Sequence, residues 1–197
     1  MRRFPALLLA AATALALAGC APSAEEQREE LRADLAEQLE AVDGVSGAWV
    51  DRIDVTVDTE QGMSVDAAKH VLDEVHTLVL GYPDDFRTVV VWFSGDGEQR
   101  WSGDWGLGAI DEQEFDQQAA FVASLSGWPG ITEADAPVSQ IAFRADGPHG
   151  DVVEGQTVQI RVAEPDGPDE AARAELQQLW TSSGGDPEQS FQWRRPW

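Results

Sequence analysis

Cysteine is nearly absent from this chain of 197 residues, which contains a single cysteine at position 20. One cysteine cannot form a disulfide within the chain, and it cannot supply the several thiolates of a structural zinc site. The fold must therefore be stabilised by packing without covalent cross-links. The chain is long enough to bury a substantial hydrophobic core.

Basic residues are also scarce, because 13 Lys and Arg stand against 36 Asp and Glu, and the net charge is −23. Proteins that bind nucleic acid neutralise phosphates with Lys and Arg, so this excess of acid argues against a nucleic-acid partner. Anionic lipid headgroups would repel the same surface.

The short motifs that carry common catalytic mechanisms are missing as well. The chain has no G-x-S-x-G, S-x-x-K, H-E-x-x-H, Walker loop or G-x-G-x-x-G. We therefore predict no catalytic residues and no cofactor. A carboxylate-dependent hydrolase acting on a glycan is the alternative. Among 36 acids some pair will lie at a useful separation by accident, so the abundance of acids is no signal for it.

The N-terminus has the pattern of an export signal. Met1-Arg2-Arg3 precede an apolar run, Ala6–Ala18, that is shorter than the roughly 20 residues of a membrane-spanning helix. The run ends in Leu17-Ala18-Gly19-Cys20, which resembles the lipobox of bacterial lipoproteins. This resemblance implies cleavage by signal peptidase II between Gly19 and Cys20, and a diacylglyceryl group on the Cys20 sulfur.

The same resemblance implies a location for the rest of the chain. Two acyl chains give stable anchoring where one would be marginal, so we expect attachment to the cell membrane on its extracytoplasmic face. Residues 1–19 would be removed as the signal, and residues 20–25 would form a short lipidated tether. Cleavage removes two arginines and no acid, which changes the net charge from −23 to −25.

Hydrophobic periodicity predicts an alternation of helices and strands. Helical spacing occurs in 25–42, 65–80, 111–126 and from 169 onward, and strand patterns occur in 52–58, 86–93, 99–107, 140–144, 157–162 and 190–194. The run 86–93 is almost continuously apolar, which predicts a central strand covered on both faces, with 99–107 as its hairpin partner. We predict an α+β fold in which helices pack on a mixed, mostly antiparallel sheet.

The second half of the chain repeats landmarks of the first. Val55 precedes Val158 by 103 residues, and Phe86 precedes Phe191 by 105. This spacing predicts two ferredoxin-like pseudo-repeats, 26–110 and 111–197, either as halves of one domain or as separate units; chance similarity is the alternative. Any strand–helix–strand connection within one sheet should be right-handed.

Eight tryptophans are the most unusual positive feature of the composition. Trp92 and Trp180 lie in apolar patterns, which predict core positions. Trp101 and Trp105 lie in a polar stretch, and exposed tryptophans concentrate binding energy, so we predict them as a candidate binding surface, with burial in the core as the alternative.

Acidic residues crowd the same hairpin and form a weak candidate metal site. Asp96, Glu98 and Asp104 are interspersed with glycines, which could allow oxygen ligands to surround calcium. Their spacing does not match an EF-hand loop, and a polar turn that needs glycine explains the pattern equally. We therefore predict no resident metal.

Together these features predict a membrane-anchored extracytoplasmic module, most simply a non-enzymatic one, that binds or supports an envelope protein or a glycan. Clustered exposed aromatic residues would indicate a binding module. A cleft containing two acids with opposed pKa shifts would indicate a hydrolase. The absence of both features would indicate a spacer.

Overall fold

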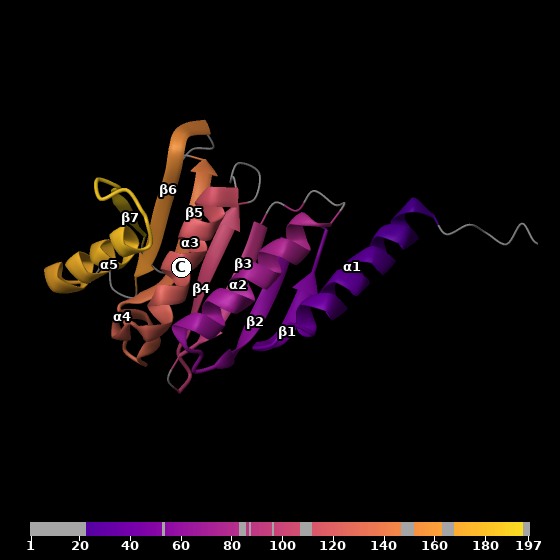
Figure 1. Ribbon diagram of the computed structural model, residues 1–197, viewed down its shortest axis with the longest axis horizontal. Coiled ribbons are helices and arrows are strands. Elements are labelled where there is room, and N and C mark those ends of the chain that lie inside the picture. Colours follow the sequence, from indigo (N-terminus) through magenta and orange to yellow (C-terminus); the bar gives the residue numbers. More distant parts are fainter. Residues whose placement is uncertain are drawn as a thin grey trace, which may run out of the picture.

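The computed structural model describes residues 23–52, 54–82, 86, 88–95, 97–106, 112–146, 152–162 and 168–194. Cys20, the predicted signal and the first half of the predicted tether lie outside these ranges. The last two residues of the predicted tether, Ala24 and Glu25, belong to the first helix and not to a linker. The described residues form a seven-stranded sheet with helices packed on one of its faces (Figure 1). No helix among them is long and apolar enough to cross a membrane.

The order of the strands in the sheet is their order in the chain. They are β1 (Val45–Val50), β2 (Asp54–Gln61), β3 (Thr88–Ser94), β4 (Arg100–Gly106), β5 (Val138–Asp146), β6 (Val152–Val162) and β7 (Phe191–Arg194). Antiparallel pairs β1–β2, β3–β4 and β5–β6 alternate with parallel pairs β2–β3, β4–β5 and β6–β7. The α+β class and the hairpin between β3 and β4 are therefore confirmed.

A parallel pair needs a crossover connection, and three helices supply the three crossovers. These are α2 (Val65–Leu80), α3 (Glu112–Ser124) and α5 (Glu170–Ser182). The residues that suggested two pseudo-repeats lie in two of these strand–helix–strand units. Val55 is on β2 and Phe86 comes just before β3, in the unit of α2, whereas Val158 is on β6 and Phe191 on β7, in the unit of α5. The sheet itself continues across the proposed boundary between residues 110 and 111, because Ser102 on β4 pairs with Gln140 on β5.

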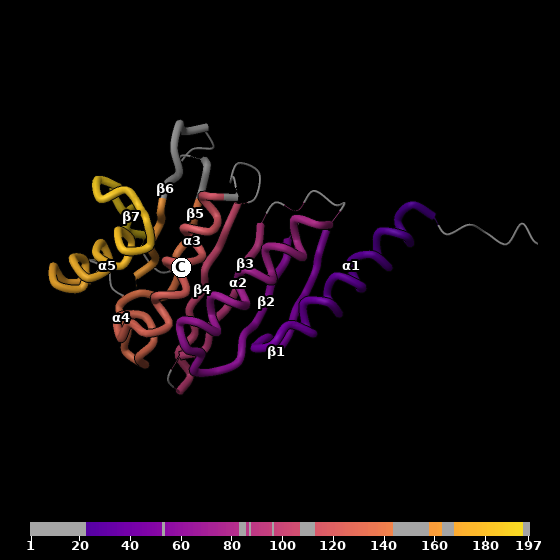
Figure 2. Tube along the Cα trace, viewed as in Figure 1, coloured from indigo at the N-terminus to yellow at the C-terminus, as the bar shows by residue number. Residues whose placement is uncertain are grey.

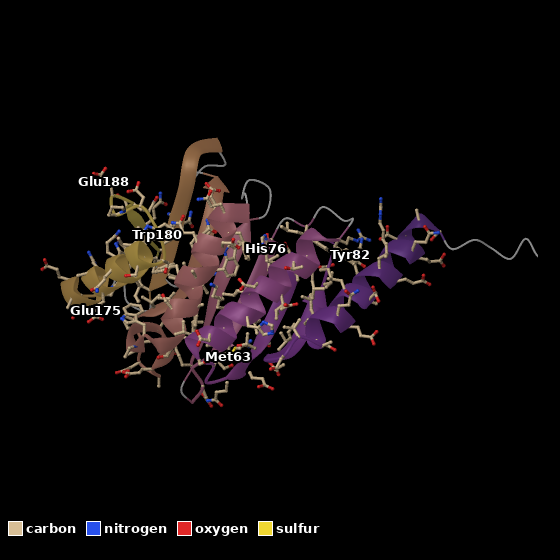
Figure 3. All side chains as sticks on the ribbon, viewed as in Figure 1. Met63, His76, Tyr82, Glu175, Trp180 and Glu188 are labelled. Carbon is tan, nitrogen blue, oxygen red and sulfur yellow. The ribbon has the colours of Figure 1, made fainter. Side chains whose placement is uncertain are left out.

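The crossovers through α2 and α3 differ in handedness. Both step in the same direction across the sheet, but β2 and β3 run antiparallel to β4 and β5. The two helices nevertheless lie side by side on one face, where Figure 3 labels His76 of α2. The His76 ring stacks on Phe115 of α3 with centroids 3.6 Å apart. This geometry requires one right-handed and one left-handed connection. The expectation of right-handed crossovers is therefore wrong for one of them.

Helices α2 and α5 begin at side-chain caps, and each buries one apolar stripe. The Ser64 hydroxyl accepts a hydrogen bond from the Ala67 amide at the start of α2, and the Asp169 carboxylate does the same for Ala172 in α5. Helix α1 (Ala24–Glu40) buries Leu35 and Leu39, mainly against β1 and α2. Its N-terminal end is exposed and projects beyond the edge of the sheet (Figure 2).

The core lies between the helices and one face of the sheet. Alternate residues of β3 face the helices, and Val89, Val91 and Phe93 are buried there, whereas Val90 and Trp92 are half-buried on the opposite face. The expected burial of this strand on both faces is therefore wrong. No helix of the described residues lies over its opposite face, because all three crossover helices pack on the other side.

Candidate binding surface

Trp101 and Trp105 do not form an exposed surface, because their exposed fractions are 1% and 0%. Trp101 stacks on Phe93 with ring centroids 4.3 Å apart, and Trp105 packs against Phe143 at 5.6 Å. Gly103 lies between them on the same face of β4, and a Cβ atom at this position would come within 2.5 Å of the Trp105 ring. The glycine that suggested an open loop instead makes room for a buried indole.

The three weak metal candidates are not shown to converge. Glu98 is exposed in the turn before β4, where Gly97 has a φ of +62°, and Asp96 lies outside the described residues. Asp104 lies on β4 with 5% exposure, and its carboxylate accepts a hydrogen bond from the Gln140 side chain at 3.2 Å. Among the described residues, no group of three or more His, Cys, Asp or Glu is placed to hold a metal ion.

The face of the sheet opposite the helices is its uncovered face, and strand register arranges its side chains in two rows that cross all seven strands. The first row aligns one residue from each strand in turn: Gly47, Asp58, Trp92, Ser102, Gln140, Arg161 and Arg194. The second row is aligned in the same way: Trp49, Thr56, Val90, Asp104, Ala142, Gln159 and Gln192. Six strand spacings of about 4.8 Å give each row a length of about 29 Å.

An aromatic and ionic cluster occupies the β1 end of these rows. The Trp49 side chain is 57% exposed, and its ring lies over Gly47, where an added Cβ atom would be 3.2 Å away. The Arg100 guanidinium lies 5.1 Å from the centre of the Trp92 ring and donates to the Asp58 carboxylate at 2.6 Å. Cation–π stacking and the ion pair hold Arg100 and Trp92 in a defined arrangement.

Amide and guanidinium groups occupy the rest of the uncovered face. Gln140, Gln159 and Gln192 come from β5, β6 and β7, and the Arg194 guanidinium donates to the Gln192 amide oxygen at 3.1 Å. The two rows contain two arginines, Arg161 and Arg194, and two aspartates, Asp58 and Asp104. Arg100 lies beside the first row, where it pairs with Ser94 of β3. Opposite charges thus balance within the two rows, although the net charge of the molecule is −23.

Ser102 is fully buried at the centre of the first row. Its hydroxyl oxygen has no hydrogen-bond partner among the described residues. The neighbouring side chains on either side are Trp92 and Gln140. A buried hydroxyl without a partner is unusual in a packed interior, and here it lies on the face that none of the described helices covers.

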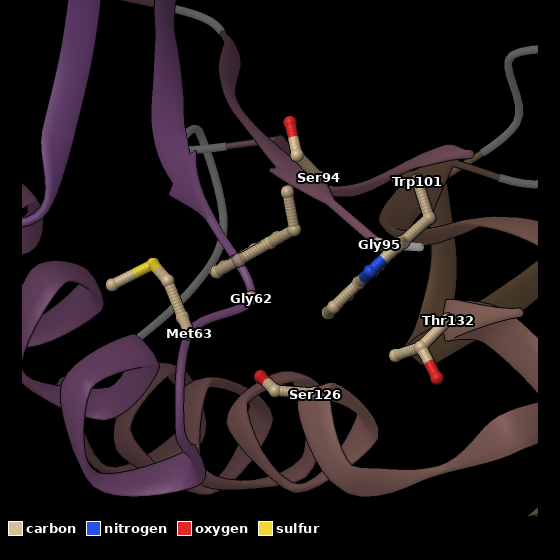
Figure 4. A pocket seen from close by; sticks show the side chains of 8 residues that line it. Gly62, Met63, Ser94, Gly95, Trp101, Ser126 and Thr132 are labelled. Carbon is tan, nitrogen blue, oxygen red and sulfur yellow. The ribbon is translucent and has the colours of Figure 1, made fainter. Parts of the chain in front are cut away.

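A small pocket lies on the helical side of the sheet, at the carboxyl end of β3 (Figure 4). Its volume is about 130 Å³, room for about four water molecules and less than a drug-sized ligand requires. The lining residues are Gly62, Met63, Phe93, Ser94, Gly95, Trp101, Ser126 and Thr132.

A larger cleft of about 340 Å³ separates α3 from α5. Its carboxylates are Glu114 and Asp186, and the Asp186 side chain accepts the backbone amide of Glu188 at 2.9 Å. Trp180, which is buried as expected, donates its indole N–H to the Asp186 carbonyl at 3.0 Å. These bonds give Asp186 a role in shaping the turn before β7.

No protein family, curated protein or solved structure matches this chain. Its function is therefore inferred from the geometry of its own residues. Sequence reasoning missed the uncovered face, although one signal was present: Arg100, Ser102 and Asp104 alternate with the two tryptophans of β4. Such alternation is the pattern of a strand with one apolar and one polar face.

Proposed function

We propose that this chain is a membrane-anchored extracytoplasmic lipoprotein and that its uncovered face is a non-enzymatic binding surface for another component of the cell envelope. The observation that carries the proposal is the group of aromatic, amide and charged side chains that strand register places in two rows on the uncovered face. Tryptophan and arginine are the residues in which binding hot spots are most enriched.

The start of α1 fits attachment through Cys20. Ser23 caps the helix only three residues after the cysteine, and Ser23 and Glu26 form a reciprocal capping box. Lipid on Cys20 would place the first turn of α1 at the membrane surface. The 17 residues of α1, at about 1.5 Å each, would then span about 25 Å between the membrane and the edge of the sheet.

Capture from the envelope tests the binding surface. The lipidated protein is used to isolate partners, in parallel with Trp49→Ala, Trp92→Ala and the matched control Leu80→Ala, whose side chain is 58% exposed on α2. We expect both tryptophan variants to lose the captured component and the control to retain it. Retention by both tryptophan variants would overturn the proposed binding surface.

Fractionation and lipid labelling test the anchor independently. We expect the wild-type chain to incorporate labelled fatty acid and to sediment with membranes. The Cys20→Ala variant should do neither, because the sulfur that would form the thioether is gone. Labelling or membrane attachment that persists in Cys20→Ala would contradict anchoring at this residue.

A further inference from the structure

We infer that the small pocket at the carboxyl end of β3 binds an uncharged phenol ring, whose hydroxyl group forms a hydrogen bond with Ser126. The pocket lies on the helical side of the sheet, so this site is separate from the uncovered face and does not rest on the function proposed for that face. Its position, its walls, its polar groups and its lack of charge each point to this class of ligand.

The pocket lies where two neighbouring parallel strands end and the chain leaves them in different directions. After β2 the chain turns at Gly62 and enters α2, whereas after β3 it turns at Gly95 into the hairpin with β4 (Figure 4). In sheets with helical crossovers, ligands bind in the crevice outside the carboxyl ends of parallel strands whose connections diverge. The pocket therefore has the position of a ligand site.

Hydrogen bonds hold the two turns at a fixed separation. The Gly62 amide donates to the Ser94 carbonyl at 3.2 Å, and the Gln61 side chain donates to the Gly95 carbonyl at 3.0 Å. Thr132 closes the pocket from the other side, because a Cβ atom added at Gly95 would lie 2.3 Å from the Thr132 carbonyl oxygen. The walls are thus formed in advance, and a ligand would not have to order them.

A buried hydroxyl group in the pocket wall is available to a ligand. The Ser126 Oγ atom is buried and has no hydrogen-bond partner among the described residues. By contrast, Thr132 donates its hydroxyl to the Trp128 carbonyl at 3.1 Å and turns its methyl group toward the pocket (Figure 4). A serine hydroxyl both donates and accepts hydrogen bonds, so Ser126 can pair with the hydroxyl group of a phenol in either direction.

Apolar side chains form the remaining walls, and they leave room for one ring. Phe93 and Trp101 stack on each other and are only 2% and 1% exposed, so they form a closed wall. Met63 is half-buried in the same pocket, and methionine adapts its shape to aromatic groups. An apolar cavity of about 150 Å³ can hold benzene. The volume of this pocket, about 130 Å³, is close to that size.

The pocket favours an uncharged ligand. None of the described residues that line it has a titratable side chain. Burial of a charged group without a partner is strongly unfavourable. A molecule with a net charge of −23 would also repel a carboxylate, and an ammonium group would find no carboxylate among the described lining residues. A phenol is uncharged at neutral pH and satisfies both the apolar walls and the Ser126 hydroxyl.

Met63 provides a specific signal for the test, because Met1 is the only other methionine of the chain and lies in the predicted signal. The lipidated protein, isotopically labelled in its methionine methyl group, is titrated in detergent and followed by nuclear magnetic resonance. The probes are phenol, toluene, benzylammonium and N-acetyltyrosinamide, and the free concentration of each is measured.

The variants separate the hydroxyl group from the space around it. Ser126→Ala removes the hydroxyl, and Ser126→Leu fills the pocket. The matched control is Ser102→Ala, which removes a buried hydroxyl without a described partner on the opposite face of the sheet. Far-ultraviolet circular dichroism and the melting temperature establish that each variant is folded.

We expect phenol to shift the Met63 methyl signal to saturation in the wild type and in Ser102→Ala. Ser126→Ala should bind phenol about two- to tenfold more weakly, because one neutral hydrogen bond is lost. Toluene has the same size without the hydroxyl, so its weaker binding should be the same in the wild type and in Ser126→Ala. Ser126→Leu should bind neither compound.

No saturable shift with phenol would overturn the site and would mean that the pocket holds only water. Equal binding of phenol and toluene, or unchanged phenol binding in Ser126→Ala, would overturn the hydrogen bond. Benzylammonium that binds as tightly as phenol would overturn the preference for an uncharged ligand. N-acetyltyrosinamide distinguishes the two sources of the ring: binding at least as tight as that of phenol assigns the pocket to a tyrosine side chain of a partner, and weaker binding assigns it to a free phenol.

Discussion

The two faces of one sheet differ most clearly on strand β4. Trp101, Gly103 and Trp105 face the helices and are closely packed, whereas Ser102 and Asp104 point to the uncovered face. On the covered face, side-chain volume determines which residues fit, as the contact between Gly103 and the Trp105 ring shows. On the uncovered face, side chains are ordered by lateral polar contacts. A sheet can thus keep one face for stability and the other for recognition.

The largest difference is expected between two tryptophans, one on each face. Trp105→Ala should reduce the free energy of unfolding by about 3–5 kcal/mol, because it leaves a cavity in the core. Trp92→Ala should cost about 1 kcal/mol, because the side chain is half-buried and solvent can fill its place. Urea unfolding measures both. Equal losses would mean that the uncovered face belongs to the core and would break the comparison.

The ion pair between Arg100 and Asp58 should contribute modestly to stability. Their side chains are 51% and 25% exposed, so solvent screens the attraction, and we expect a coupling energy of about 0.2–1 kcal/mol. A double-mutant cycle with Arg100→Gln and Asp58→Asn, measured at low and high salt, determines it. A coupling of several kcal/mol that salt leaves unchanged would show that this part of the face is shielded from water.

The Ser102 hydroxyl should contribute almost nothing to stability. It is buried without a hydrogen-bond partner among the described residues, so Ser102→Ala should change the free energy of unfolding by less than about 0.5 kcal/mol, or raise it. Thermal and urea unfolding measure the change, with Ser94→Ala on β3 as a comparison. A loss above about 1 kcal/mol would indicate that the hydroxyl has a bonding partner in solution.

The smallest effect is expected at the start of α1, far from either face. The backbone amide of Ser23, and then its hydroxyl, lower the pKa of Glu26 below its ordinary value of 4.5. A lowered pKa in the folded state stabilises the first turn above pH 4.5, and this stabilisation is lost as the pH falls through the folded value. The carboxylate is fully exposed, so the change should be local.

Amide hydrogen exchange in the first turn of α1 measures this local effect. Protection should decrease on acidification in the wild type, and the decrease should be smaller in Glu26→Gln, which has no titrating carboxyl at this position. Identical pH profiles for the two chains would contradict a role for the Glu26 carboxylate in the cap.

Much of the secondary structure could be predicted because its patterns are local. Helix α2 begins and ends where the periodicity of 65–80 places it, since Ser64 caps it and an apolar stripe runs along it. Strand β1 was missed because Val45–Val50 contains Gly47 and shows no clean alternation. Trp92 was assigned to the core, because an apolar neighbourhood does not show which side of a strand a helix will cover.

The sequence by itself determined the α+β class, the positions of most helices and strands, and the alternation of polar with apolar residues on β4. These depend on contacts between residues a few positions apart. Only the tertiary structure decided which face is covered, which hand each crossover takes, and that seven residues from Gly47 to Arg194 share one row. Strand register depends on packing between distant segments, and a shift by one residue would turn every side chain of a strand to the other face.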